Sequence, residues 1–186
     1  MIVLSFALPV LTPFFSNSSP NPSGSDEPPS LQDFTLPTSE GGDIRLTERV
    51  ASYSNVILVF HRGFECAACR AQLSEIQSGY DDLRIEGAEV LAIGLDNQLN
   101  TQRLTLQAGL RFPMLYDESG VVAASYGVRD ELTDSNFTTA VFILDRDLKQ
   151  VINAVGTVDD QLLPVAVILD VLREAHGTNP SGGTPS

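Results

Sequence analysis

The sequence predicts an α/β fold in which a central mixed β-sheet is flanked by helices. Residues 56–60 (VILVF) form a continuous apolar run, as expected of a central strand that is buried on both faces. An amphipathic segment begins at Cys66, and a second apolar run follows at residues 88–95. This strand–helix–strand order predicts a pair of parallel strands. Two apolar runs close together near the C-terminal end predict an antiparallel hairpin, so the sheet is expected to be mixed.

The first half of the chain is expected to contain two short strands, one or two helical turns and a long helix. Residues 33–37 and 40–46 predict the two strands, joined by a turn, and residues 47–53 predict the helical turns. Beyond Cys66, apolar residues recur at alternating steps of four and three, which places one stripe of a helix on the sheet. That stripe comprises Cys69, Leu73, Ile76, Tyr80 and Leu83. We expect this helix to end at Gly87.

A second, weaker helix is predicted at residues 97–110. In this segment Leu99, Leu106 and Leu110 can share one face of the helix, whereas Leu104 lies off that face. The remaining elements are, in order, an edge strand at residues 112–116, a short helix at 120–126, a hairpin of residues 139–144 and 150–155, and a last helix at 159–175.

Two prolines refine the second half of this assignment. Pro113 cannot donate a hydrogen bond to a strand ladder, so its strand is expected at an edge of the sheet. Pro164 is tolerated best in the first turn of a helix, so the last helix is expected to start about one turn later than its apolar pattern does.

The 186 residues predict one domain at residues 31–176, with a tail on either side. Residues 1–30 combine an apolar N-terminal segment with a linker rich in Ser and Pro, which is expected to be flexible. Residues 177–186 are polar and are expected to be disordered.

The apolar segment at residues 1–15 is ambiguous. It is too short to span a bilayer, and Pro9 and Pro13 interrupt it. No Lys or Arg precedes Arg45, so the segment lacks the positive charge of a secretory signal. Tethering to a membrane, export, and a disordered or misassigned start all remain open. The compartment is not decided, and a cytoplasmic location is slightly favoured over a tethered extracytoplasmic one.

The charge of the chain argues against two classes of partner. The formal net charge is -13 at pH 7. Binding to nucleic acid or to an anionic membrane surface needs clustered Lys and Arg, so neither partner is expected.

The only two cysteines, Cys66 and Cys69, form a CxxC motif at the predicted start of the long helix. Unpaired N–H groups and the positive end of the helix dipole stabilise a thiolate there, and a second sulfur can close a disulfide on it. The open end of the helix should make Cys66 the more exposed sulfur. Zinc would need two further ligands, and no second cysteine pair exists, so no metal ion and no cofactor are expected. A buried pair that only packs is the remaining alternative.

Several segments together resemble the peroxiredoxin-like AhpC/TSA family. The resemblance covers about residues 31–174, and it implies a thioredoxin fold with a peroxiredoxin-like insertion. The matching segments are DFTLP (33–37), FHRG (60–63), CAACR (66–70), EVLAIG (89–94), FPMLYD (112–117), SYGV (125–128) and FILD (142–145).

The chain departs from the family pattern at the site itself. Typical peroxiredoxins place a proline, a threonine or serine, and the peroxidatic cysteine at a fixed spacing, and here Arg62, Cys66 and Cys69 take those positions. Thr139 stands where such enzymes carry an arginine. The cis-proline of thioredoxins is absent as well. The chain therefore resembles atypical members of the family that carry CxxC.

These observations predict an antioxidant oxidoreductase that reduces peroxide through a dithiol–disulfide cycle, with a thiol donor such as thioredoxin restoring the dithiol. Exposure favours Cys66 as the attacking thiolate and Cys69 as the resolving thiol, whereas the resemblance assigns Cys69 to the peroxide. Arg62 and Arg70 could favour the thiolate, and His61 could shuttle protons. One alternative is a thiol-disulfide oxidoreductase acting on protein disulfides. A non-enzymatic module on the same fold is the other.

Overall fold

The apolar run expected at the centre of the sheet is β3 (Asn55–His61), and all seven of its residues are buried. The structure is a computed structural model that describes residues 32–133, 137–157 and 163–177. The other strands of the main sheet are β4 (Ala88–Gly94), β5 (Met114–Tyr116), β6 (Phe137–Leu144) and β7 (Gln150–Thr157).

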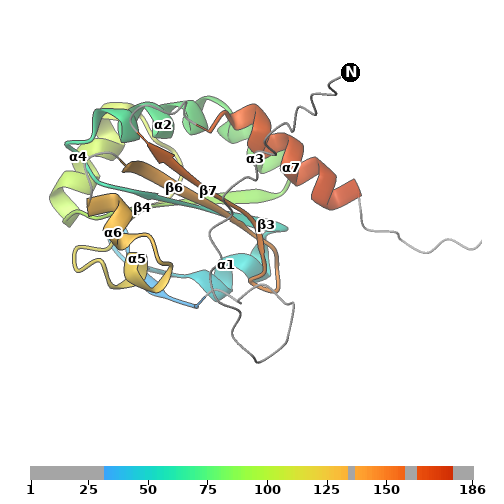
Figure 1. Ribbon diagram of the computed structural model, residues 1–186, viewed down its shortest axis with the longest axis horizontal. Helices are drawn as coiled ribbons and strands as arrows, with labels where there is room; N and C mark the ends of the chain where they lie inside the picture. The colour runs from blue at the N-terminus through green and yellow to red at the C-terminus, as the bar shows by residue number, and fades with distance from the viewer. Residues whose placement is uncertain (1–31, 134–136, 158–162, 178–186) are drawn as a thin grey trace, which may run out of the picture.

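These five strands have the order β5-β4-β3-β6-β7 (Figure 1). β4 runs parallel to both β3 and β5, whereas β6 is antiparallel to β3 and to β7. The mixed sheet, the edge position of β5 and the hairpin are therefore confirmed. The register pairs His61 with Gly94 on one side and with Thr139 on the other.

Helices cover both faces of the sheet (Figure 1). One face carries α1 (Leu46–Ser52), α5 (Val121–Ser125) and α6 (Arg129–Thr133), of which α6 was not expected from the sequence. The other face carries α2 (Ala67–Ser78), α3 (Tyr80–Ile85), α4 (Gln98–Ala108) and α7 (Val165–Gly177). Each face encloses its own cluster of buried apolar side chains.

The first two predicted strands, β1 (Thr35–Pro37) and β2 (Asp43–Arg45), form a separate antiparallel pair. The turn after β1 reaches the edge of the main sheet, where Thr38 bridges to Leu115 and the Ser39 N–H donates to the Met114 carbonyl at 2.8 Å. This contact covers part of an edge strand that would otherwise present unpaired backbone groups.

The single long helix predicted after Cys66 is wrong, because Gly79 divides it into α2 and α3. A Cβ at Gly79 would lie 2.6 Å from a methyl group of Val165, so the glycine allows α7 to begin against this break. The last helix begins at Val165, one residue after Pro164, as the delayed start predicted.

The face predicted for α4 is also wrong. Leu104, expected to lie off the packed face, is fully buried, whereas Leu99 is 55% and Leu106 is 76% exposed. The helix packs through Leu104 and Thr101, and the Thr101 hydroxyl donates to the Asn97 carbonyl. This internal hydrogen bond lets a polar residue take a core position, which a count of apolar residues does not anticipate.

Residues 1–30, the predicted apolar segment and linker, lie outside the described residues, as do residues 178–186 of the predicted tail. Within the described part of the chain, no helix is long and apolar enough to cross a membrane.

Candidate active site

Cys66 is the N-cap residue of α2, the residue at which the chain turns from the β3 loop into the helix. Its backbone is extended, with φ -82° and ψ 103°, and its sulfur accepts the N–H of Cys69 at 3.1 Å. An N-cap side chain satisfies one of the backbone donors that the first helical turn leaves unpaired. Here that acceptor is sulfur, so the sequence places a potential nucleophile where a thiolate would gain a hydrogen bond and the positive end of the helix dipole.

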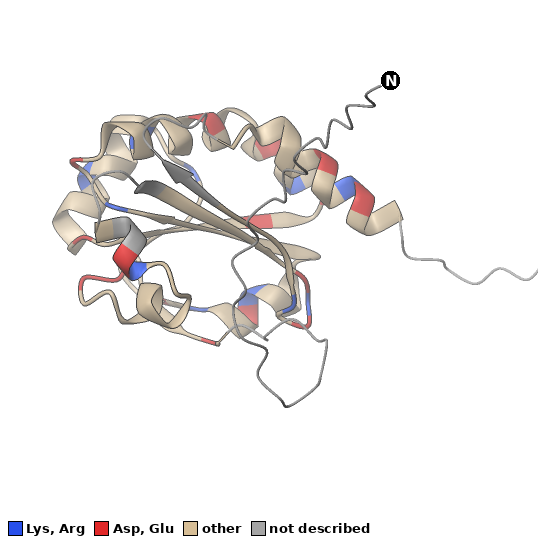
Figure 2. Ribbon diagram, in the orientation of Figure 1, with Lys and Arg blue, Asp and Glu red and all other residues tan. Residues whose placement is uncertain are grey.

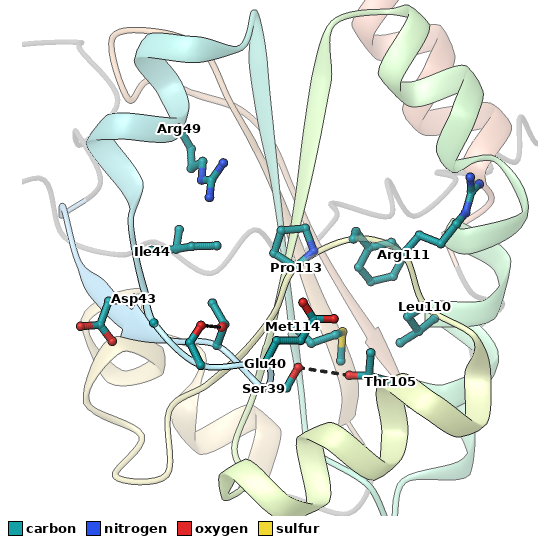
Figure 3. Close-up of a pocket in the computed structure, with 14 residues that line it drawn as sticks. Ser39, Glu40, Asp43, Ile44, Arg49, Thr105, Leu110, Arg111, Pro113 and Met114 are labelled. Carbon is teal, nitrogen blue, oxygen red and sulfur yellow. Dashed lines mark hydrogen bonds between the residues drawn. The ribbon is translucent and has the colours of Figure 1, made fainter.

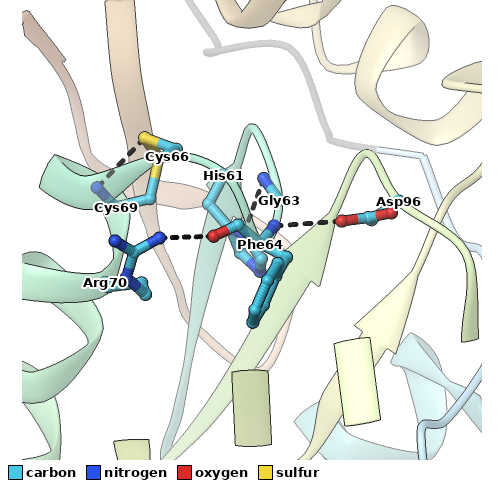
Figure 4. Close-up of a disulfide and its surroundings, with 7 residues drawn as sticks. All are labelled: His61, Gly63, Phe64, Cys66, Cys69, Arg70 and Asp96. Carbon is cyan, nitrogen blue, oxygen red and sulfur yellow. Dashed lines mark hydrogen bonds between the residues drawn. A yellow bond between two sulfur atoms is a disulfide. The ribbon is translucent and has the colours of Figure 1, made fainter. Parts of the chain in front are cut away.

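The two cysteines form a disulfide in this structure (Figure 4). Cys66 is 9% exposed and Cys69 is not exposed at all, which confirms the predicted order of accessibility. Cys66 borders an open cavity of about 370 Å³, together with Arg62, Glu65, Ala67 and Ala68. A reagent in this cavity therefore meets the sulfur of Cys66 first.

The loop from β3 to Cys66 is held by hydrogen bonds from three directions. The Gly63 N–H donates to Nδ1 of His61 at 3.2 Å, and the Phe64 N–H donates to the Asp96 carboxylate at 3.0 Å. The Phe64 carbonyl accepts Nη1 of Arg70 at 2.5 Å (Figure 4). The structure thus brings the predicted residues His61 and Arg70 to this loop and adds Asp96, which sequence reasoning missed.

His61 is fully buried at the end of β3, and burial lowers its pKa to about 4, although the charge of Asp96 opposes the shift. Since Nδ1 accepts a hydrogen bond, the neutral ring carries its proton on Nε2. Nε2 finds no hydrogen-bond partner in the described part of the chain. At neutral pH the imidazole is therefore uncharged and cannot stabilise a thiolate by its charge.

The remaining supporting residues take different places. Arg62 lines the cavity that Cys66 borders, and from there its positive charge could favour a thiolate. Thr139 is buried and lies opposite His61 in the register of β3 and β6. The strand position that carries an arginine in typical family members thus supplies a neutral residue at the end of the sheet.

A larger cavity, of about 590 Å³, has a separate set of lining residues (Figure 3). It is bounded by the turn after β1, the end of α4 and the start of β5, and Arg49, Thr105 and Met114 are among its lining residues. Its lining includes no cysteine or histidine, so the candidate thiol site is the smaller cavity.

The AhpC/TSA family model matches residues 29–154 of this sequence. The chain belongs to the AhpC/TSA family. The matched segment runs from before β1 to within β7 and includes both cysteines, so the resemblance predicted from the motifs is confirmed.

Two curated relatives in this family differ in their named activity. The thiol-disulfide oxidoreductase ResA of Geobacillus thermodenitrificans is 26% identical over 163 residues, which cover 86% of each chain. The peroxiredoxin Bcp of Escherichia coli is 28% identical over 98 residues, which cover 53% of this chain and 62% of Bcp. Both relatives are oxidoreductases, and the expectation of a thiol-based oxidoreductase is confirmed.

The solved structures show the same fold. The peroxidoxin BcpB of Mycobacterium tuberculosis superposes with a TM-score of 0.67 at 19% identity, covering 80% of this chain and 96% of that one. The AhpC/TSA protein described here thus has the thioredoxin fold that the order of its elements predicted. Members of the family take electrons from thiol reductants and act on peroxides or disulfides.

Proposed function

We propose that this protein is a dithiol peroxidase in which Cys66 attacks the peroxide and Cys69 resolves the product. One observation carries the proposal: Cys66 caps α2 and borders an open cavity, while Cys69 lies buried beside it within disulfide distance. A peroxide could reach Cys69 only after the helix start had opened.

The proposed cycle begins with the Cys66 thiolate attacking one oxygen of the peroxide. The O–O bond breaks, Cys66 becomes a sulfenic acid, and the other oxygen leaves as an alcohol, or as water when the substrate is hydrogen peroxide, after taking up a proton. The Cys69 thiol then attacks the Cys66 sulfur, which releases water and closes the disulfide. A donor dithiol reduces this disulfide by two successive exchange steps and is itself oxidised to a disulfide.

The thiolate would be favoured by groups already at the site. The N–H of Cys69 points at the Cys66 sulfur, and Arg62 and Arg70 add positive charge near it. Glu65 lines the same cavity and opposes them. We assign His61 the role of holding the loop through Gly63 rather than of shuttling protons, because its pKa of about 4 keeps it neutral.

Exchange with a protein disulfide is the second candidate function. The match to ResA supports it, since it covers 86% of this chain against 53% for Bcp. The small side chains of Ala67 and Ala68, which flank the Cys66 sulfur, leave room for a bulky partner. The position that carries an orienting hydroxyl in typical peroxiredoxins holds Cys66 itself, which weakens the peroxide assignment.

The first experiment is to mix the reduced protein with one equivalent of hydrogen peroxide and to follow free thiols by stopped flow. We expect both thiols to disappear far faster than those of free cysteine, Cys69→Ser to form a sulfenic acid at Cys66, and Cys66→Ser to react slowly. Slow loss in the wild type would contradict peroxidase activity. Rapid reduction of an insulin disulfide by the same protein would then support protein disulfide exchange.

The electron donor is tested separately. We propose a thioredoxin-type dithiol, because the disulfide is reached through the open cavity at Cys66. Peroxide turnover should depend on thioredoxin, thioredoxin reductase and NADPH. Turnover with glutathione but not with thioredoxin would contradict this donor.

A further inference from the structure

The backbone of Phe64 is hydrogen-bonded on both sides of its Cα atom. Its N–H donates to Oδ2 of Asp96, in the loop that follows β4, and its carbonyl accepts Nη1 of Arg70, from α2 (Figure 4). A negative and a positive side chain therefore hold the two adjacent peptide groups of one residue in the loop that carries Cys66. Hydrogen bonds that involve a charged group are about twice as strong as neutral ones, so these two contacts should fix the Phe64 backbone.

Gly63 shows how closely Asp96 approaches the loop. Its φ is +112°, a conformation that side chains rarely adopt, and a Cβ added there would lie 2.6 Å from Oδ2 of Asp96. Both the backbone conformation and the nearby carboxylate thus require glycine at this position.

The Asp96 carboxylate is itself fixed by the start of α4. Its Oδ1 accepts the Asn97 N–H at 2.9 Å and Nδ2 of Asn100 at 2.8 Å. These bonds hold the carboxylate in one orientation, so the loop is fastened to a rigid helix start rather than to a mobile side chain.

Arg70 connects the Phe64 backbone to the turn that carries the cysteines. Its backbone N–H donates to the Cys66 carbonyl at 3.1 Å, and its guanidinium is bound to the Phe64 carbonyl. An arginine side chain loses rotamer entropy when it is held, so without a fixed acceptor it would move among solvated conformations. The fixed Phe64 carbonyl keeps the positive charge on the helical turn that contains both sulfurs.

We propose that Asp96 is a positioning residue for the redox site, which holds the Phe64 backbone through its N–H so that the Phe64 carbonyl keeps Arg70 beside the CxxC turn. The proposal rests on the proposed role of Cys66 as the attacking sulfur. It concerns a residue that touches neither the sulfurs nor a substrate, and it makes the start of α4 a support for the chemistry at the start of α2.

The charges around Cys66 determine the direction in which the pKa of its thiol should shift if the proposal holds. Arg62 and Glu65 lie in its loop, Arg70 on its helix and Asp96 in the neighbouring loop, while His61 below is neutral. Removing the negative charge of Asp96 by itself would lower the pKa of the Cys66 thiol. Loss of positioning releases Arg70 and raises that pKa. The two effects have opposite signs, so the direction of the shift decides between them.

The test measures the pH dependence of iodoacetamide alkylation in the reduced full chain, with mass spectrometry locating the modified cysteine. We expect Asp96→Ala to raise the pKa of the Cys66 thiol by about one unit, which makes alkylation at neutral pH about tenfold slower. Asn97→Ala is the matched control, because it removes the cap of α4 in the same loop but leaves the Phe64 contact in place. Its thiol pKa should equal that of the wild type.

Two further variants keep the test decisive if Asp96→Ala does not fold. Gly63→Ala should crowd the carboxylate away from the loop, and Arg70→Gln should remove the charge that the loop holds, so both should raise the thiol pKa. Asp96→Ala combined with Arg70→Gln should not raise the thiol pKa above that of Arg70→Gln alone, because the rise expected from Asp96→Ala acts through Arg70.

An unchanged or lowered thiol pKa in folded Asp96→Ala, equal shifts in Asp96→Ala and Asn97→Ala, or additive effects in the double variant would overturn the role of Asp96. Preferential alkylation of Cys69 in the wild type would instead overturn the proposed role of Cys66. The comparison of Asp96→Ala with Asn97→Ala would still decide whether Asp96 positions the turn.

Discussion

Two helices of this protein, α2 and α4, follow neighbouring parallel strands and begin with the same local geometry. Each has an N-cap residue in an extended conformation, Cys66 for α2 and Asn97 for α4. The Cys66 sulfur accepts the Cys69 N–H at 3.1 Å, and the Asn97 amide oxygen accepts the Asn100 N–H at 3.0 Å. Because the carboxyl ends of parallel strands meet at one edge of a sheet, both helix starts lie at the edge where α/β proteins place their sites.

The two helix starts differ in the features that could make a capping side chain reactive. Asn97 is exposed, and its amide oxygen does no chemistry. Cys66 is largely buried, has a second sulfur one turn away and is flanked by arginines. A common structural device, the side-chain cap, thus becomes a candidate catalytic group when the acceptor is sulfur and the surroundings favour its thiolate.

The charge distribution also differs between the start of α2 and the rest of the molecule. Acidic residues are spread over several helices and loops of the described part of the chain (Figure 2), in keeping with the formal net charge of -13 at pH 7. Two of the few basic residues, Arg62 and Arg70, nevertheless lie at the start of α2. Asp96, at the start of α4, meets this region through the Phe64 peptide.

The largest effect is expected for a variant that separates the capping role of Cys66 from its proposed role in catalysis. Cys66→Ser keeps a cap acceptor but removes the nucleophile, so peroxide turnover should fall on the order of 10³-fold or more. The unfolding free energy of the reduced protein should change by about 1 kcal/mol or less, since serine is a good N-cap. Peroxide consumption and urea denaturation under reducing conditions measure the two quantities. Retained turnover in Cys66→Ser would show that the cap sulfur is not the attacking group.

The next effect concerns the buried imidazole beneath the α2 loop. The pKa of His61 falls from about 6.5 in the unfolded chain to about 4 in the folded protein, so the unfolded state binds this proton first on acidification. His61 therefore contributes stability above pH 6.5 that is lost as the pH falls to about 4, by about 3 kcal/mol in total.

Urea denaturation between pH 7 and pH 4 checks this dependence. His61→Gln should be less stable at pH 7, because it disturbs the buried contact with Gly63, but its stability should fall less steeply with acidification. Equal slopes in the wild type and the variant would mean that His61 does not remain neutral over this range.

The position of the CxxC motif at a helix start could be predicted from the sequence because its signals are local. The buried strand, the CxxC motif and the helical stripe beginning at Cys69 all lie within one continuous segment, and the apolar run that became β3 has no competing interpretation. Helix polarity then suffices to rank Cys66 as the more exposed sulfur.

Asp96 could not be predicted in the same way, because its role depends on strand pairing. The alignment of His61 with Gly94 in β3 and β4 brings the two following loops together, and only then does Asp96 meet Phe64. Its position just after a parallel strand was the available signal. The face of α4 failed for a related reason, since Thr101 enters the core only because its hydroxyl is bound within the helix.

A smaller effect is expected at the start of α4. Asn97→Ala removes the side-chain acceptor of the Asn100 N–H, and such a loss costs about 0.5 to 2 kcal/mol. Peroxide turnover per folded molecule should remain at the wild-type level, because the Asp96–Phe64 contact does not use the Asn97 side chain. Thermal unfolding and turnover, measured on the same preparation, check both statements. A selective loss of turnover would mean that the α4 cap is itself part of the site.

The smallest expected effect is a difference in thiol pKa, and its test places a cysteine at the N-cap position of α4. In a Cys66→Ser/Cys69→Ser background, Asn97→Cys gives a protein with one cysteine at the equivalent helix position. The helix dipole should lower the pKa of this thiol, but the adjacent Asp96 carboxylate should raise it. We therefore expect a pKa of about 8.5, the ordinary value of a cysteine. The pKa of the Cys66 thiol in Cys69→Ser should be lower by about one unit or more.

Alkylation rates as a function of pH give both values, and their difference measures the combined effect of the arginines near Cys66 and of the Asp96 carboxylate beside position 97. Equal pKa values would place the reactivity of Cys66 in the helix dipole alone, and Arg62, Arg70 and Asp96 would then have no electrostatic part in it. A higher pKa at position 97 would show that the charges near each helix start, and not the helix dipole alone, set the pKa of a capping thiol.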